Sequence, residues 1–195
     1  MIEALPLVFT SGWASGINAY AVVALLGLLG RFGGADAVPA ALQRTDVLTV
    51  ALVLFAIELV VDKIPWVDST WDSVHTVIRP VIGTALGLLL AGDVSDLQSG
   101  VLAATGGATA LASHAVKLAI RLGVNTSPEP ASNIAVSTAE DVTVASVVSL
   151  ALVAPWVAAG IAALLLVAGI VIVVLLAARI RRARARWRER WAQST

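Results

Sequence analysis

The sequence contains no cysteine, which excludes disulfide bonds and thiolate metal sites. Charged residues are also scarce: Asp, Glu, Lys and Arg make up 13% of the 195 residues, and the formal net charge is zero. We find no nucleophile elbow, zinc-protease motif or glycine-rich phosphate loop. No folded basic surface with a readable motif points to nucleic acid. We therefore expect a protein that is not an enzyme, uses no cofactor and binds no nucleic acid.

Hydrophobic residues, in contrast, make up 58% of the chain, and the mean hydropathy is +0.90. This composition is typical of an integral membrane protein whose partner is the lipid bilayer. The long apolar runs lack the alternation of a barrel, so the predicted fold class is all-α. A span needs about 20 helical residues, which predicts about six transmembrane helices. They lie near residues 13–30, 47–61, 77–92, 99–120, 142–154 and 160–178.

The stretch 142–178 has no charged residue and would extend about 55 Å as one helix. This length is too great for one crossing, so we expect the chain to fold back between Pro155 and Gly160. The first apolar run has no basic leader or cleavage signal before it, and we interpret it as a retained span.

The chain also repeats itself. Five residues recur with a displacement of 94: Gly12, Ala14, Ala21, Val22 and Leu28 correspond to Gly106, Ala108, Ala115, Val116 and Leu122. Asp46, Val47, Val53 and Ala56 correspond to Asp141, Val142, Val148 and Ala151 with a displacement of 95. We predict one transmembrane domain, 1–178, made of two inverted three-helix repeats at about 5–92 and 97–178.

Glycine-rich interruptions fall at matching places in the first helix of each copy. They lie at Thr10-Ser11-Gly12 and Ser15-Gly16, and again at Thr105-Gly106-Gly107. Such interruptions are typical of broken helices that hold an ion or polar substrate, so helices one and four are candidates for a break. The alternative, which we favour for the glycines alone, is close helix packing through small residues.

Lysine and arginine predict the orientation. With six spans and both termini cytoplasmic, eleven of these residues face inward, and only Arg31 and Arg44 face outward. We expect a bacterial cytoplasmic (inner) membrane protein with a basic cytoplasmic tail at 179–195. Seven arginines between Arg179 and Arg190 would anchor this tail and can contact anionic lipid. A chain this small would need a second copy to enclose a pathway, so a homodimer is also expected.

Polar residues inside the predicted spans are the candidate site. Asp68, Asp72, His75 and Arg79 share one helix face, and His114, Lys117 and Arg121 share another. Ionisable residues in a span are costly and usually face a bundle interior or a wet cavity. The predicted pathway consists of the following residues: Asn18, Tyr20, Glu58, Asp62, Asp72, His75, Arg79, His114, Lys117, Glu140 and Asp141.

Three segments carry a resemblance to a known family. They are Ser15 to Tyr20; Asp62 to Pro65 with Asp72, His75, Arg79 and Pro80; and Ser127 to Pro130 with Asn133, Glu140 and Asp141. In these segments the chain resembles an uncharacterised family of small bacterial multi-span membrane proteins, known as a domain of unknown function. The resemblance implies a membrane protein and supplies no catalytic assignment.

The leading functional hypothesis is a small transporter or channel for an ion or small polar solute, with a polar pathway at the repeat interface. In this hypothesis Glu58 or Asp141 binds a proton or cation and His75 or His114 relays protons. The alternative is a scaffold, lipid-handling or accessory protein whose buried charges pair structurally. Asp68, Asp72 and His75 together also suit a divalent metal, although Arg79 and Lys63 would repel it.

Overall fold

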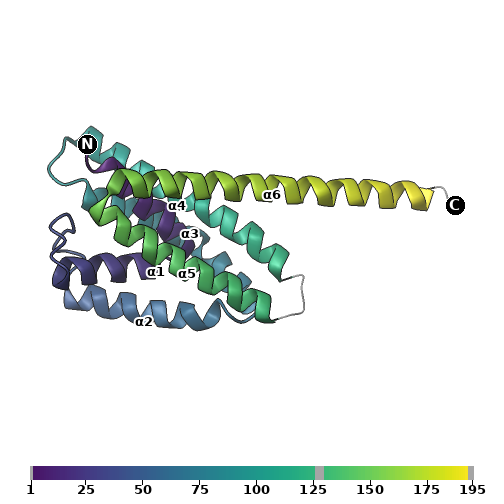
Figure 1. The fold of residues 1–195 in the computed structure, drawn as a ribbon, viewed down its shortest axis with the longest axis horizontal. Helices are drawn as coiled ribbons and strands as arrows, with labels where there is room; N and C mark the ends of the chain where they lie inside the picture. Colours follow the sequence, from purple (N-terminus) through teal and green to yellow (C-terminus); the bar gives the residue numbers. More distant parts are fainter. Residues whose placement is uncertain (1, 126–129, 193–195) are drawn as a thin grey trace.

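The computed structural model describes residues 2–125 and 130–192, with the side chain of Pro130 and most side chains beyond Arg182 left out of the description. Six α-helices follow one another along the chain (Figure 1). They are α1 (Leu5–Phe32), α2 (Thr45–Val61), α3 (Val67–Leu90), α4 (Asp96–Val124), α5 (Pro130–Val153) and α6 (Pro155–Ala192). This result confirms the predicted all-α class and the six helices.

Local sequence signals explain several helix ends. Pro6 lies in the first turn of α1, where its missing N–H costs nothing. Ser95 caps α4 by accepting a hydrogen bond from the Gln98 N–H. Val153 ends α5 and Pro155 begins α6, so the chain folds back at Ala154, one residue before the predicted interval. The helix α3 begins at Val67 without a side-chain cap.

Four helices are long and apolar enough to cross a membrane: α1, α3, α5 from Ala131, and α6 as far as Arg182. The helix α2 has only 17 residues, and α4 carries buried charged side chains. These findings support the membrane class.

The backbone of α1 is broken at Asn18, which has φ −147° and ψ 94°. In the first half, residues 5–17, Trp13 O accepts a hydrogen bond from Ser113 Oγ and Ile17 O accepts one from Lys117 Nζ. Residue numbers therefore rise together in both helices, so the first half runs parallel to α4.

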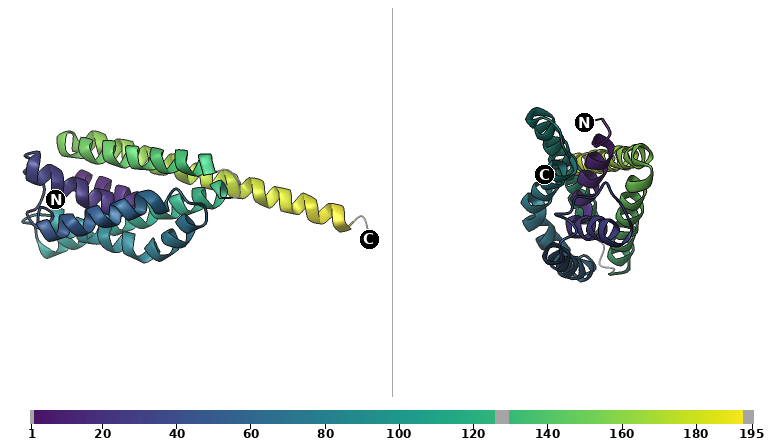
Figure 2. Two further views of the ribbon diagram at one scale, coloured as in Figure 1. Left: turned by 90° about the horizontal axis from the view of Figure 1, so that it is seen from below. Right: turned by 90° about the vertical axis from the view of Figure 1, so that its left-hand side faces the viewer.

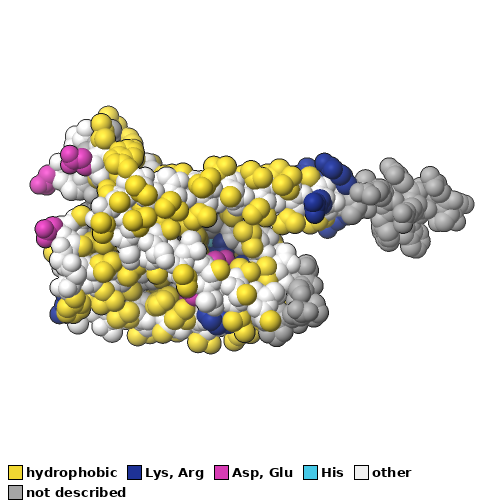
Figure 3. Space-filling view, in the orientation of Figure 1, with side chains coloured by type: hydrophobic (Ala, Val, Ile, Leu, Met, Phe, Trp, Pro, Cys, Tyr) yellow, Lys and Arg dark blue, Asp and Glu magenta, His cyan; other side chains and the backbone are white. Residues whose placement is uncertain are grey.

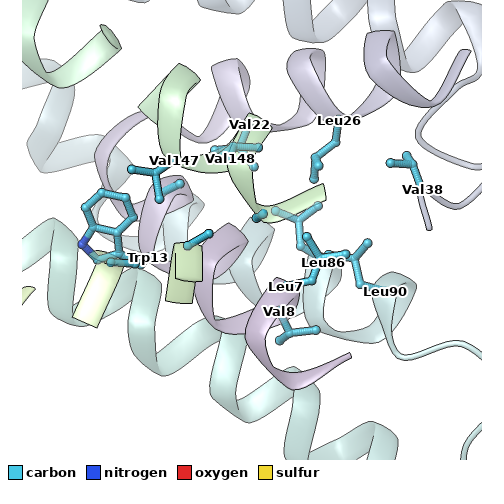
Figure 4. Packing of buried hydrophobic residues seen from close by; sticks show 14 of the residues in the cluster. Leu7, Val8, Trp13, Val22, Leu26, Val38, Leu86, Leu90, Val147 and Val148 are labelled. Carbon is cyan, nitrogen blue, oxygen red and sulfur yellow. The ribbon is translucent and has the colours of Figure 1, made fainter. Parts of the chain in front are cut away.

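The second half of α1, residues 19–32, runs back toward the start of the chain. Gly27 lies against Leu42 and Leu48 near the beginning of α2. Leu26 joins Leu7 in the same buried core, together with Leu86 of α3 (Figure 4). Each half is about 20 Å long, which is shorter than the hydrocarbon core of about 30 Å. We therefore describe α1 as a re-entrant hairpin with Asn18 at its tip.

This hairpin occupies the centre of the bundle. Residues of α1 contact all five other helices, and its first half is buried on nearly every side. Seen end-on, the other helices lie around it, while α6 continues far beyond the bundle (Figure 2). The basic tail therefore continues the last helix at least to Ala192, and its side chains at Arg186, Arg188 and Arg190 lie outside the described residues.

Glycines allow the close approaches around α1. A Cβ on Gly12 would lie 2.6 Å from Gly106 O, and a Cβ on Gly16 would lie 2.2 Å from Ala110 O. Neither position breaks the helix. The break falls instead at Asn18, and α4 has no non-helical residue in its interior. The structure thus supports close packing for the glycines and corrects the expectation of a break in helix four.

The hairpin also changes the predicted topology. The first half of α1 runs parallel to α4, whereas its second half runs the opposite way. Because α2 and α5 also run in opposite directions, as do α3 and α6 (Figure 1), the second half of α1 with α2 and α3 has the directions that an inverted repeat of α4, α5 and α6 requires. The start of α1 and the far end of α6 lie at opposite ends of the bundle (Figure 1). The prediction that both termini are cytoplasmic assumed a full crossing by α1, whereas α1 turns back at Asn18. The side of the membrane on which each terminus lies stays a prediction.

Candidate functional site

A network of charged side chains fills the part of the bundle that the hairpin does not reach. We call it the buried charge cluster. Its members come from α3, α4, α5 and the C-terminal end of α2: Glu58, Asp62, Asp68, Asp72, Arg79, Lys117, Arg121 and Glu140. All except Glu140 are at most 3% exposed, and the side chain of Glu140 is 17% exposed. The predicted faces of α3 and α4 are both buried, as their spacing indicated.

We call the part of the cluster around Arg79 its inner end. Arg79 Nη2 lies 2.5 Å from Glu58 Oε1 and 2.8 Å from Asp72 Oδ1. Its Nη1 donates to Gly16 O at the hairpin tip and to His114 Nδ1. One guanidinium therefore joins α1, α2, α3 and α4.

We call the part of the cluster around Lys117 and Arg121 its outer end. Lys117 Nζ lies 2.6 Å from Asp62 Oδ2, and Arg121 Nη2 lies 2.6 Å from Glu140 Oε2. Arg121 is also 3.6 Å from Asp68 Oδ2. These contacts bring opposite charges from α2, α3, α4 and α5 to one end of the bundle.

The hairpin tip faces this cluster with both of its helix ends. The first half ends in carbonyls that have lost their helical partners, and Arg79 and Lys117 donate to those of Gly16 and Ile17. The Asn18 side-chain oxygen caps the second half by accepting from the Ala21 N–H, while its Nδ2 donates to Asp141 Oδ1. Cations thus lie at a helix C-terminus and a carboxylate lies near a helix N-terminus, as the helix dipoles favour.

The two histidines differ in what they can do. Arginine can only donate, so His114 Nδ1 must accept from Arg79, and the proton of neutral His114 is on Nε2, which donates to Asp72 O. His114 therefore cannot become positively charged without losing this contact. His75 donates from Nδ1 to Trp71 O, and its Nε2 lies 2.8 Å from the Tyr20 hydroxyl. Of the two predicted relay residues, only His75 has a nitrogen able to accept a proton here.

Charges of the two signs do not balance in the cluster. Five carboxylates face only three cationic side chains, an excess of two negative charges when all are ionised. Several buried carboxylate oxygens also lack a hydrogen-bond donor: Glu58 Oε2, Asp62 Oδ1, Asp68 Oδ2 and both oxygens of Asp72. Buried charges that are not compensated are strongly unfavourable. We therefore expect a bound positive charge to compensate this negative excess.

The metal hypothesis receives no support from the geometry. Within residues 2–125 and 130–192, no three side chains of His, Cys, Asp or Glu are arranged to hold a metal ion. Asp68 turns toward Asn125 and Arg121, whereas His75 stacks on Trp71 with the ring centroids 4.5 Å apart. The helical spacing placed Asp68, Asp72 and His75 on one face, but each has a different partner.

The remaining predicted residues lie at the edge of the cluster. Asp141 lies 3.9 Å from Lys63 and also binds Asn18, so it joins the hairpin tip to α5. Sequence reasoning missed Asn125 and Asn133, which bind Asp68 and Arg121 respectively. Only Asn133 offered a signal, since it belonged to the segments that carry the family resemblance.

Three cavities approach the site from the sides of the bundle. One of about 350 Å³ lies between α1, α2 and α3 and is bordered by Tyr20 and Asp46. A second, of about 240 Å³, reaches Lys117 and Glu140 beneath α6, where Figure 3 shows charged atoms within a recess. A third, of about 140 Å³, reaches Asp141. None of these three is lined by Glu58, Asp62 or His114.

Comparison with known proteins identifies the family. The match to the domain of unknown function DUF4126 covers residues 5–175. The chain belongs to the DUF4126 family. The matched region contains the hairpin, the buried charge cluster and nearly all of the six-helix bundle. No curated protein matches this family member, and no solved structure does so either.

Proposed function

We propose that this protein is a small membrane transporter or channel for an ion or a small polar solute, with its pathway where the hairpin tip meets the buried charge cluster. The observation that carries the proposal is the helix break at Asn18, about halfway through the bundle, opposite an unbalanced set of buried charges. Non-helical backbone at membrane depth is tolerated where protein buries it or where it lines a cavity. Broken helices with their ends facing an ion are a recurring device of transporters.

The contacts of the tip fit such a role. Two backbone carbonyls at the end of the first half already bind cationic groups, those of Arg79 and Lys117. Tyr20, two residues after the break, borders the cavity of about 350 Å³ and contacts His75. A polar group entering from this cavity would therefore meet Tyr20 and His75 before the cluster.

The orientation belongs to the same proposal. Arginines of α6 lie at one end of the molecule, and acidic side chains lie at the opposite end, where α1 begins (Figure 3). We call this opposite end the hairpin end. The positive-inside rule then places the basic end in the cytoplasm of a bacterial inner membrane. In this proposal α2 to α6 cross the bilayer and the α1 hairpin does not, so the start of α1 faces the outside. A homodimer and contacts between anionic lipid and the tail complete the proposal.

A second candidate is a non-transport scaffold or lipid-handling protein. It is favoured by the density of ion pairs, since each buried cation contacts at least two carboxylates. In that case the cluster would lock the helices together and nothing would move through it. The two candidates differ in what neutralising one carboxylate should do.

Flux through liposomes containing the purified protein separates them. We would measure the movement of protons, sodium, potassium, magnesium and chloride, first for the wild type and then for Glu58→Gln. Transport predicts flux of at least one probe and its loss in a variant that still folds. The matched control is Asp36→Asn on the exposed loop after α1, which should retain flux. Absence of flux for every probe with folded protein would favour the scaffold.

A further inference from the structure

We propose that the buried charge cluster binds two protons, one shared by Glu58 and Asp72 and one among Asp62, Asp68 and Glu140. Protons are then the ion that this site exchanges, an inference that rests on the proposed function for its link to transport. Proton binding itself follows from the charges and contacts of the cluster alone.

Each end of the cluster has one carboxylate too many. At the inner end, Glu58 and Asp72 face Arg79, and at the outer end Asp62, Asp68 and Glu140 face Lys117 and Arg121. The remaining pair at the edge, Lys63 with Asp141, is balanced. One positive charge at each end would make the whole network neutral.

Glu58 and Asp72 are neighbours with unused oxygens. Glu58 Oε1 and Asp72 Oδ1 both contact the same Arg79 nitrogen, so two carboxylates approach one guanidinium group. Both residues have no exposed surface, and Glu58 Oε2 and Asp72 Oδ2 have no hydrogen-bond donor. Two adjacent carboxylates away from water favour a state in which they share one proton.

The groups around this pair leave few other ways to supply the charge. They come from five helices: Tyr20 from α1, Asp62 from α2, His75 and Arg79 from α3, His114 and Lys117 from α4, and Glu140 from α5. His114 accepts from Arg79 and stays neutral. His75 contacts Trp71 and Tyr20, and no described ion pair joins it to a carboxylate. The protons therefore belong on the carboxylates.

A metal or alkali ion fits less well than protons. Arg79 already contacts both carboxylates of the inner end, and Lys117, whose shortest ion pair is with Asp62 of the outer end, lies 3.7 Å from Asp72 Oδ1 and 3.9 Å from Glu58 Oε1. A further cation would have to enter beside them. A proton needs no coordination shell and can sit on one carboxylate oxygen.

Infrared spectroscopy of the purified protein in detergent tests this inference directly. A protonated carboxyl group has a carbonyl band distinct from that of a carboxylate, and exchange into heavy water shifts it. We expect a band equivalent to two carboxylic acids near neutral pH. Glu58→Gln and Asp72→Asn should each remove about half of it, and Asp96→Asn at the exposed start of α4 should change nothing. Both neutral variants imitate a protonated carboxylate, so folding should persist.

The outcomes separate this inference from the proposed function. A folded protein without a carboxylic acid band overturns the inference, and so does a band that sodium or magnesium abolishes. A band that Glu58→Gln and Asp72→Asn leave intact overturns the shared pair. If the band behaves as expected but liposomes show no flux, the proton site stands and transport fails. If flux occurs without proton movement, transport stands and proton exchange fails.

Discussion

At the scale of single residues, Arg79 is the side chain on which the inner end of the cluster depends. Changing it to Gln would leave Glu58 and Asp72 buried without their shared cation. Removing one partner of a buried ion pair costs about 3–5 kcal/mol. We expect Arg79→Gln to lower the melting temperature in detergent strongly at neutral pH and less at acid pH, because the two carboxylates can then take up protons.

The control is the same substitution at Arg44, whose pair with Asp46 at 2.6 Å is solvent-exposed. Arg44→Gln should leave the melting temperature nearly unchanged, since exposed pairs contribute little. The double variant Arg79→Gln/Glu58→Gln should recover part of the stability lost by Arg79→Gln alone. If the single and double variants melt alike, Glu58 does not interact with Arg79 as the geometry indicates.

The side chain of Asn18 is expected to stabilise the fold by capping the second half of α1. Asn18→Ala removes the cap on the second half of α1 and the contact with Asp141. Loss of an N-cap costs about 1 kcal/mol. Asn18→Ser keeps a capping oxygen, so thermal unfolding should rank the wild type above Ser and Ser above Ala. Equal melting temperatures for Ser and Ala would show that the cap contributes nothing.

At the scale of helices, the packing of α1 against α4 depends on small residues. A Cβ on Gly16 would lie 1.9 Å from Ser113 Oγ and 2.2 Å from the backbone oxygen of Ala110, which cannot move without shifting α4. Overpacking of this kind typically costs about 1–3 kcal/mol. We therefore expect Gly16→Ala to destabilise the protein in a thermal unfolding assay and to weaken the contact of Arg79 with the Gly16 carbonyl.

The matched control is Gly160→Ala in α6, where nothing lies within 4 Å of the new methyl group. Alanine is the better helix former by about 1 kcal/mol, so this variant should be as stable as the wild type or more so. If Gly16→Ala behaves like Gly160→Ala, α1 and α4 are not packed as closely as described.

The helices also show what sequence could and could not predict. Apolar runs located all six, and helical spacing correctly placed Asp72 with Arg79 and Lys117 with Arg121 on buried faces. The reversal of α1 was missed because 28 largely apolar residues resemble one long span. The break depends on a single residue, Asn18, whose importance lies in contacts with Ala21 and Asp141. Pairing partners could not be predicted either, since they depend on which helices are neighbours.

At the scale of the whole molecule, the hairpin decides on which side of the membrane each end of the chain lies. A full crossing by α1 would give six spans and both ends on one face. With a re-entrant α1, as in the proposal above, five helices would cross and the ends of the chain would face opposite sides; in the ribbon these ends lie at opposite ends of the bundle (Figure 1). The absence of native cysteine makes this difference easy to measure with single introduced thiols.

We expect Ile2→Cys, which is exposed before α1, to react with a membrane-impermeant maleimide in intact cells. Arg182→Cys on α6 should react only after the membrane is opened, because the basic end faces inward. Asp93→Cys, in the loop between α3 and α4, is the internal reference and should behave like Ile2→Cys, since both lie at the hairpin end. If Ile2→Cys instead followed Arg182→Cys, α1 would cross the bilayer completely and the polar tip at Asn18 would not be the end of a hairpin.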